Sequence, residues 1–157
     1  MRALPASVLW PAYAGVLPFA ALTLGLWVLP PGWRPAAGEA LLGYGAVILS
    51  FVGALHWGHA LLRRDEALRA GQAAPVAADR AFLCSVCPAL AGWTALQLPF
   101  VPALGLLGAG FIGQLMVDVH LARALSLPEA FLPFRLRVTA AVLLCLLAAS
   151  AASALAT

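Results

Sequence analysis

Charged side chains are scarce in this sequence, and lysine is absent altogether. Only 10% of the 157 residues are charged, whereas 64% are hydrophobic; a soluble domain has about 25% charged residues. A soluble domain of about 150 residues leaves roughly 30% of its chain surface in water, and nine arginines with six acidic residues cannot cover it. The composition therefore excludes a soluble globule, and the high apolar content excludes a disordered chain.

Cysteines and catalytic motifs are equally sparse. Three cysteines are too few for a small disulfide-stapled secreted module. The sequence has no phosphate-binding glycine loop, no nucleophile elbow around Ser50 or Ser85, and no two carboxylates on one helix face. It also has no basic run with interleaved aromatics, so no nucleic-acid partner is expected. These absences favour a non-enzymatic protein whose surroundings are the lipid bilayer.

Apolar segments, in contrast, dominate the chain. Five of them have 18 to 23 residues each, namely 7–29, 41–62, 81–98, 102–121 and 138–156. At about 1.5 Å per residue each can cross a hydrocarbon core of about 30 Å, and unpaired backbone groups in lipid require helices. The first segment is too long for a signal-peptide core and is expected to be retained. The prediction is an all-α, polytopic integral membrane protein, with residues 1–157 forming a single transmembrane domain of five helices.

The arginines predict the orientation of this bundle. With the N-terminus in the cytoplasm, Arg34 alone falls on the outer side. Eight arginines then lie on the inner side, where positive charge accumulates: Arg2, Arg63, Arg64, Arg69, Arg80, Arg123, Arg135 and Arg137. The C-terminus would lie on the outer side.

Asp118 is the one charged residue inside an apolar segment. A carboxylate within the membrane costs about 2.5–3.5 kcal/mol and normally faces the bundle interior with a partner. We expect that partner to be His56, with Trp57 beside it and Gln114 one helical turn before Asp118. Two alternatives stay open. Asp118 reaches Arg63 or Arg123 at the membrane surface, or His56 is a hydrogen-bonded packing residue without further function.

Two cysteines and two histidines share the depth of Asp118. Cys84 and Cys87, together with His56 and His59, have the spacing of a tetrahedral metal site, and the histidines alone could ligate haem. The alternative is that both thiols pack as small apolar side chains. The sequence leaves the cofactor undecided, and no cofactor is the simplest interpretation.

Small residues and prolines predict how the helices pack. In the second segment, Gly43, Ala46, Ser50, Gly53 and Trp57 recur at helical spacing, with Gly58 next to them; in the fourth, Gly105, Ala109 and Gly113 do so. Such ladders let helix backbones approach closely in lipid, within one chain or toward a partner. Pro11, Pro18 and Pro88 should bend their helices and free carbonyl groups inside the bundle.

The connection before the last segment predicts a short helix in the inner membrane interface. Ser126 and Glu129 have the spacing of a capping box. Apolar residues and two arginines follow, as is typical of an interfacial helix: Phe131, Leu132, Phe134, Arg135 and Arg137. The alternative is a plain loop whose arginines reach the lipid headgroups.

Several blocks of the sequence resemble a known family. They include the segments 13–19, 44–58 and 85–90, Trp93, Asp118 and the segment 132–139. With these blocks the chain resembles domain-of-unknown-function family 3429, a family of small proteobacterial membrane proteins that includes mitochondrial transmembrane protein 69. The resemblance implies a multi-helix protein of the bacterial inner membrane without an assigned reaction. It draws attention to Gly53, His56, Trp57, Gly58 and Asp118, and does not extend to His59.

Three functions are compatible with the sequence. The first is a non-enzymatic accessory or assembly subunit that contacts the lipid bilayer and other membrane-protein subunits, or a second copy of itself. The alternative is a protein that handles a small molecule or protons, or binds haem or a metal, at an intramembrane His56 and Asp118 site. A transporter, the third, would need a cavity that is open to one side and reaches Asp118.

Overall fold

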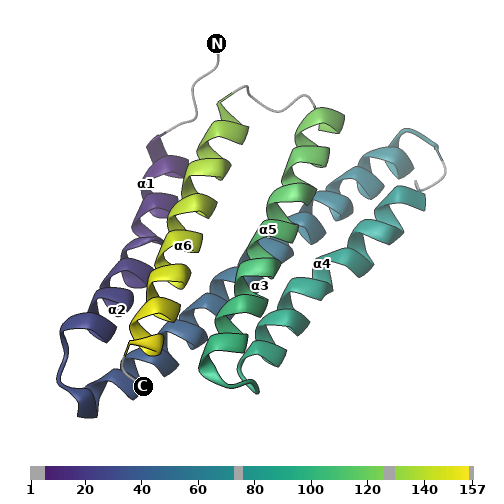
Figure 1. The fold of residues 1–157 in the computed structure, drawn as a ribbon. Helices are drawn as coiled ribbons and strands as arrows, with labels where there is room; N and C mark the ends of the chain where they lie inside the picture. The colour runs from purple at the N-terminus through teal and green to yellow at the C-terminus, as the bar shows by residue number, and fades with distance from the viewer. Residues whose placement is uncertain (1–5, 73–75, 126–129, 156–157) are drawn as a thin grey trace.

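The computed structural model describes residues 6–72, 76–125 and 130–155, without the side chains of residues 8, 59, 63, 76–84 and 121–125. Within this part every regular element is a helix (Figure 1), which confirms the all-α prediction. The elements are α1 (Ala6–Ala14), α2 (Leu17–Val28), the short 3-10 helix η1 (Pro31–Trp33), α3 (Arg34–Arg69), α4 (Val76–Ala95), α5 (Phe100–Leu125) and α6 (Phe131–Ala154).

Within the described residues, four stretches of helix are long and apolar enough to cross a membrane. They are Leu9–Val28, Pro31–Arg69, Phe100–His120 and Phe131–Ala154. They cover four of the five predicted segments. The helix α4, which contains most of the predicted segment 81–98, is not among these stretches. The count of five spans therefore stays a prediction.

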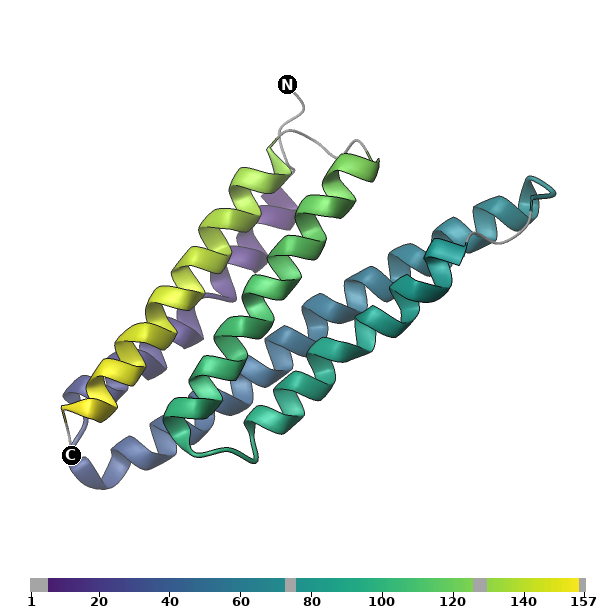
Figure 2. The same ribbon diagram turned by 45° about the vertical axis from the view of Figure 1, so that its right-hand side comes forward.

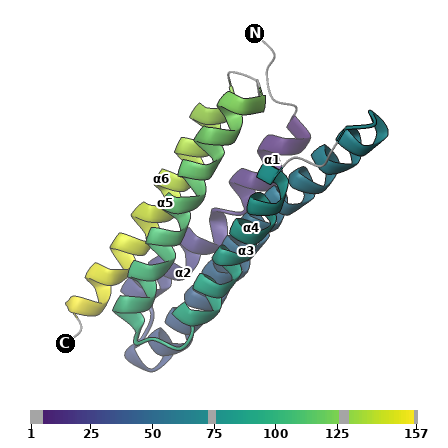
Figure 3. The same ribbon diagram turned by 90° about the vertical axis from the view of Figure 1, so that its right-hand side faces the viewer.

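The helices form an elongated bundle in which α3 and α4 make a long antiparallel hairpin (Figures 1 and 3). Helices α5 and α6 make a second antiparallel pair, and the connected ends of α3 and α4 diverge from it (Figure 2). With 36 residues, α3 spans about 54 Å and exceeds a hydrocarbon core of about 30 Å. If the apolar part of α3 crosses a membrane, its last turns, which carry Asp65 and Arg69, extend beyond the hydrocarbon.

The buried faces of α3 and α5 repeat at helical spacing. Both helices begin at the same end of the bundle and run in the same direction (Figure 1). The buried face of α3 carries Leu41, Leu49, Val52, His56 and Ala60. That of α5 carries Ala103, Leu107, Phe111, Gln114 and Asp118. Each face is apolar along most of its length, with His56 as the buried polar residue on α3 and Gln114 and Asp118 as those on α5. These polar positions lie in the second half of two helices that run in the same direction.

The first span is interrupted in its middle, as its prolines predict. Helix α1 ends at Ala14 and α2 begins at Leu17, because Pro18 has no backbone N–H to continue the helix. The Tyr44 hydroxyl of α3 donates a 2.9 Å hydrogen bond to the Gly15 carbonyl in this interruption. The Tyr44 ring also packs edge-on against Phe19, with ring centroids 5.0 Å apart. A neighbouring helix thus satisfies a carbonyl that would otherwise lie bare in lipid.

One of the five predicted packing glycines is in close contact with another helix. A Cβ added to Gly53 would lie 2.8 Å from Pro88 Cγ and 2.9 Å from the Ser85 carbonyl oxygen of α4. A second close approach is at Gly92 of α4, where an added Cβ would lie 3.1 Å from the Cα and from the carbonyl oxygen of Ala46. The hairpin of α3 and α4 is therefore held by close backbone contact.

The other four predicted packing glycines make no close contact with the described part of the chain. Among these residues, nothing lies within 4 Å of a Cβ built at Gly43, Gly58, Gly105 or Gly113. On α5, Gly110 faces Leu49 instead, one position away from the predicted ladder. The spacing of the small residues was predicted correctly, but the rotation of α5 turns its ladder outward. The remaining expectation, contact of that ladder with a partner, stays a prediction.

The predicted interfacial helix before the last span is not a separate element. Phe131, Phe134 and Arg135 form the first turns of α6, which continues without a break to Ala154. Pro133 does not interrupt the helix, because a first-turn residue needs no backbone hydrogen bond. The predicted capping box at residues 126–129 lies outside the described residues. Arg135 is thereby carried on a helix that crosses the bundle.

Candidate functional site

Asp118 of α5 is buried and is held by side chains from two other helices. Its Oδ2 atom accepts a 2.6 Å hydrogen bond from Arg135 Nε on α6. Its Oδ1 atom lies 3.0 Å from Nε2 of His56 on α3. The Asp118, His56 and Arg135 side chains are 8%, 10% and 16% exposed. We refer to these three residues as the Asp118 cluster, in which both carboxylate oxygens are engaged.

The pairing of His56 with Asp118 follows from the register of α3 and α5. Both residues lie on a buried and mainly apolar face, in the second half of helices that run in the same direction. The structure therefore brings together the two residues that the sequence analysis paired. The alternative, in which Asp118 reaches Arg63 or Arg123, concerns side chains outside the described part of the chain.

Arg135 is the residue of the cluster that the sequence analysis missed. It was assigned to an interfacial helix, where its charge would face the lipid headgroups. Continuous helix from Phe131 places Phe131, Arg135, Val138 and Val142 on one face, and all four line the same cavity. The signal that could have identified it is this apolar spacing of three and four residues on either side of the arginine.

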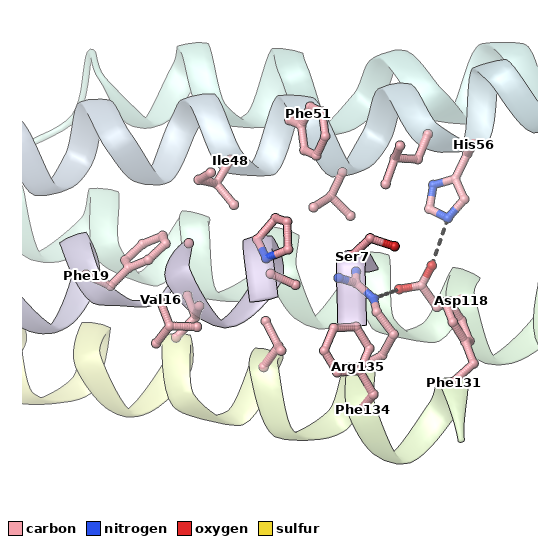
Figure 4. Close-up of a pocket in the computed structure, with 17 residues that line it drawn as sticks. Ser7, Val16, Phe19, Ile48, Phe51, His56, Asp118, Phe131, Phe134 and Arg135 are labelled. Carbon is pink, nitrogen blue, oxygen red and sulfur yellow. Dashed lines mark hydrogen bonds and ion pairs between the residues drawn. The ribbon is translucent and has the colours of Figure 1, made fainter. Parts of the chain in front are cut away.

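The Asp118 cluster closes one end of a cavity of about 500 Å³. Figure 4 shows Phe19, Val16 and Ile48 toward the other end of this cavity. The walls are mainly apolar and come from α1 with α2, from α3 and from α6: Pro11, Ala12, Gly15, Val16 and Phe19; Ile48, Phe51, Val52 and Leu55; Phe131, Phe134, Val138 and Val142. A volume of this size is typical of small-molecule sites, which are about 300–1,000 Å³. We refer to this cavity as the cleft.

The cleft opens between α1 and α3. Phe51 and Leu55 on α3 line it and are 61% and 56% exposed, and Pro11 on α1 is exposed as well. On a helix that crosses a membrane, exposed side chains of this kind face hydrocarbon. The opening is thus suited to a molecule that arrives from the lipid.

The hydrogen-bond donors that a ligand could reach in the cleft come mainly from Arg135. Its Nε is engaged with Asp118, and within the described residues its two terminal nitrogens donate no hydrogen bond. A guanidinium has five N–H donors in a planar fork. The described residues therefore leave four donors to an acceptor at the polar end of the cleft, where Ser7 of α1 also lines the wall.

The other predicted site residues take separate positions. Gln114 is buried one turn before Asp118, and its carbonyl oxygen accepts no hydrogen bond from the described residues. Trp57 is 58% exposed on α3. His120 is exposed, and its Nδ1 lies 2.8 Å from the Met116 carbonyl of its own helix. Of these three, Gln114 alone shares the buried face of Asp118.

The proposed metal ligands are not assembled within the described residues. Among these residues no group of three or more histidine, cysteine or acidic side chains lies close enough to hold a metal ion. The side chains of His59 and Cys84 lie outside the described part. Cys87 is exposed, and His56 is already engaged with Asp118. The described geometry thus offers a charged cluster beside an apolar cleft as the candidate site.

Comparison with known proteins gives a family without a reaction. A family model described as Protein of unknown function (DUF3429) matches residues 4–151. The matched stretch includes all three residues of the Asp118 cluster and every residue that lines the cleft. No curated protein and no solved structure matches the chain. The function therefore has to be argued from the cluster and the cleft.

Proposed function

The chain belongs to the family of unknown function DUF3429, and from that premise we propose that it binds a lipophilic small molecule in the cleft, as a multi-pass protein of the bacterial inner membrane. The polar end of the molecule lies at the Asp118 cluster. The observation that carries this proposal is the buried, doubly paired Asp118 at one end of an apolar cavity of about 500 Å³.

The free-energy cost of burying charged side chains supports a functional interpretation of the Asp118 cluster. Burying ionised groups is expensive, and apolar residues of similar volume are often as stable as a buried ion pair. A charged cluster that lines a cavity between apolar helices is accordingly a candidate site for binding a ligand or transferring protons. The mainly apolar walls add area for a lipophilic body, and the cluster adds a few polar groups that fix its orientation, which is the usual division in small-molecule sites.

Filling the cleft should remove the bound molecule. Val138 lines the cleft, and the cleft has room for the larger side chain of phenylalanine. Val138→Phe is therefore expected to fold. We expect solvent extraction of the purified protein, followed by mass spectrometry, to release a lipophilic compound from the wild type and at least ten-fold less from this variant. Ala140→Phe is the matched control, because Ala140 is exposed on the same helix and does not line the cleft. Equal extracts from all three proteins would contradict the proposal.

A second variant separates binding from folding. Replacing His56 and Asp118 by Leu and Arg135 by Met exchanges the Asp118 cluster for apolar side chains, which costs little stability when all partners are removed together. This triple variant should keep its helical circular dichroism and still lose the extracted compound. A variant that folds and keeps the compound would show that the cluster takes no part in binding.

The same proposal includes five membrane crossings. Helices α3 and α5 begin at the same end of the bundle (Figure 1), so α4 has to return the chain across the thickness that α3 traverses. The orientation we propose, with the N-terminus in the cytoplasm and the C-terminus outside, is supported by eight arginines on one side against one on the other.

An accessory or assembly role is a second candidate, and the outer face of α5 favours it. Gly105, Ala109 and Gly113 form a ladder of small, exposed residues that no helix of the described chain covers. Ladders of this kind let a further helix approach closely in lipid. We expect mild-detergent purification of a tagged chain to recover a membrane-protein partner or a second copy. Ala109→Leu adds a bulky side chain in the middle of the ladder and should reduce that recovery several-fold, whereas Leu144→Ala on the exposed face of α6 should not.

Recovery of the tagged chain always alone and monomeric would count against the accessory role. It would leave the proposal for the cleft untouched, because the cleft lies between α1, α3 and α6 and the ladder faces away from the bundle.

A further inference from the structure

The walls of the cleft and the free donors of Arg135 together specify a chemical class of ligand. We infer that the cleft binds a single-chain carboxylic acid of fatty-acid type, with its carboxylate on Arg135 and its hydrocarbon chain directed toward Phe19 and Ile48. This inference rests on the proposed function and names the ligand of that same site.

The carboxylate end is assigned by the geometry of the guanidinium. Arg135 uses its Nε to hold Asp118, which leaves the edge formed by its two terminal nitrogens. Two parallel N–H groups on such an edge match the two oxygens of a carboxylate, and these bidentate pairs are among the strong hydrogen bonds of proteins. A cationic ligand head would instead meet the guanidinium of Arg135 at close range, and both Asp118 oxygens already contact Arg135 or His56.

A bound carboxylic acid would place a second carboxylate beside the guanidinium of Arg135. Arg135 would then lie between two carboxylates, one from Asp118 and one from the ligand, while His56 contacts the other oxygen of Asp118. Asp118 keeps Arg135 in place, since one residue without the other would be a buried unpaired charge. Asp118 is in this view a positioning residue, and Arg135 is the group that touches the ligand.

The hydrocarbon chain is assigned by the shape and the opening of the cleft. Phe19, Val16 and Ile48 lie toward the end away from Arg135 (Figure 4). The opening between α1 and α3 is bordered by exposed apolar residues, among them Phe51 and Leu55. A single chain can enter sideways from the bilayer and lie along the cleft, with each buried CH₂ contributing about 0.8 kcal/mol relative to water.

A photoreactive probe tests this assignment in lipid. The protein is reconstituted in phosphatidylcholine vesicles with hexadecanoic acid that carries a diazirine in its chain, and labelled residues are identified by mass spectrometry. We expect labelling of segments 16–19 and 48–51 at least ten-fold above that of Leu144 and Leu147. These two leucines are 66% and 67% exposed on α6 and report contact with bulk lipid.

Four comparisons make the result decisive. The diazirine alcohol of equal chain length should label the cleft at least ten-fold less than the acid. Arg135→Gln should remove the cleft labelling, and the exposed Arg137→Gln on the same helix should leave it unchanged. Val138→Phe, which leaves the Asp118 cluster intact, should block the labelling as well. A phosphatidic acid with the same photoreactive chain should label the cleft less than the free acid.

Each contrary result has a distinct meaning. Equal labelling by acid and alcohol, both blocked by Val138→Phe, would overturn the carboxylate assignment and leave the cleft as a site for lipophilic molecules. Stronger labelling by phosphatidic acid would overturn the single-chain assignment in the same way. Labelling of the cleft no stronger than that of Leu144, and unaffected by Val138→Phe, would overturn both this inference and the proposed function.

Discussion

Asp118→Asn should lower the free energy of unfolding by about 3–5 kcal/mol, which is the usual cost of removing one partner from a buried ion pair. The substitution keeps the size of the side chain and deletes its charge. Arg135 would then lie 16% exposed without a counter-charge, and His56 would lose the carboxylate at 3.0 Å. Reversible unfolding of the purified protein by dodecyl sulfate in mixed micelles, followed by circular dichroism, measures the loss.

The matched control is Asp65→Asn on α3. Asp65 pairs with Arg69 at 2.8 Å, but the two side chains are 50% and 80% exposed. Exposed helix pairs of this kind contribute about 0.3–0.5 kcal/mol, so this variant should be nearly as stable as the wild type. Adding Arg135→Gln to Asp118→Asn should restore part of the loss, since it removes the stranded cation. Equal stability of the two Asp→Asn variants would show that Asp118 is not in a buried ion pair.

Gly53→Ala should destabilise the hairpin of α3 and α4 by about 1–3 kcal/mol, the range measured for methyl groups forced into packed sites. The added Cβ would lie 2.8 Å from Pro88 Cγ and 2.9 Å from the Ser85 carbonyl oxygen. Neither neighbour can yield easily, because one belongs to a closed ring and the other to the backbone of α4. The two helices would have to separate, and the same micelle unfolding experiment measures the cost.

Gly58→Ala is the control on the same helix. Nothing in the described chain lies within 4 Å of a Cβ at that position. Alanine favours the helix over glycine by up to about 1 kcal/mol, so this variant should be as stable as the wild type or slightly more stable. Combining Gly53→Ala with Pro88→Ala should recover part of the loss, since it removes the ring. If Gly53→Ala behaved like Gly58→Ala, the close contact between α3 and α4 would be refuted.

Composition and local periodicity were sufficient for the all-α fold and for the four helical stretches, among the described residues, that are long and apolar enough to cross a membrane. Scarce charge and long apolar segments follow from lipid as solvent, and each apolar segment had to become a helix because its backbone can be satisfied only within itself. The prolines of the first span predicted its interruption, because a proline lacks the backbone N–H that its own helix needs and this effect does not depend on other segments. Asp118 and His56 were identifiable since both carry a polar group at the same depth on an apolar face.

Contacts between distant segments were decided by the tertiary structure alone. The rotation of α5 about its own axis places Gly105 and Gly113 on the outer face and brings Gly110 to Leu49. The spacing of small residues predicts which of them share a face, but not which neighbouring helix that face contacts. Helix α6 begins at Phe131, so Arg135 contacts Asp118 and does not lie at the membrane surface as predicted. The sequence could not give this start, because the first residue of a helix near a proline depends on what its first turns pack against. The cleft likewise exists only because residues of α1, α2, α3, α5 and α6 are brought together, which is a property of the bundle and not of any one helix.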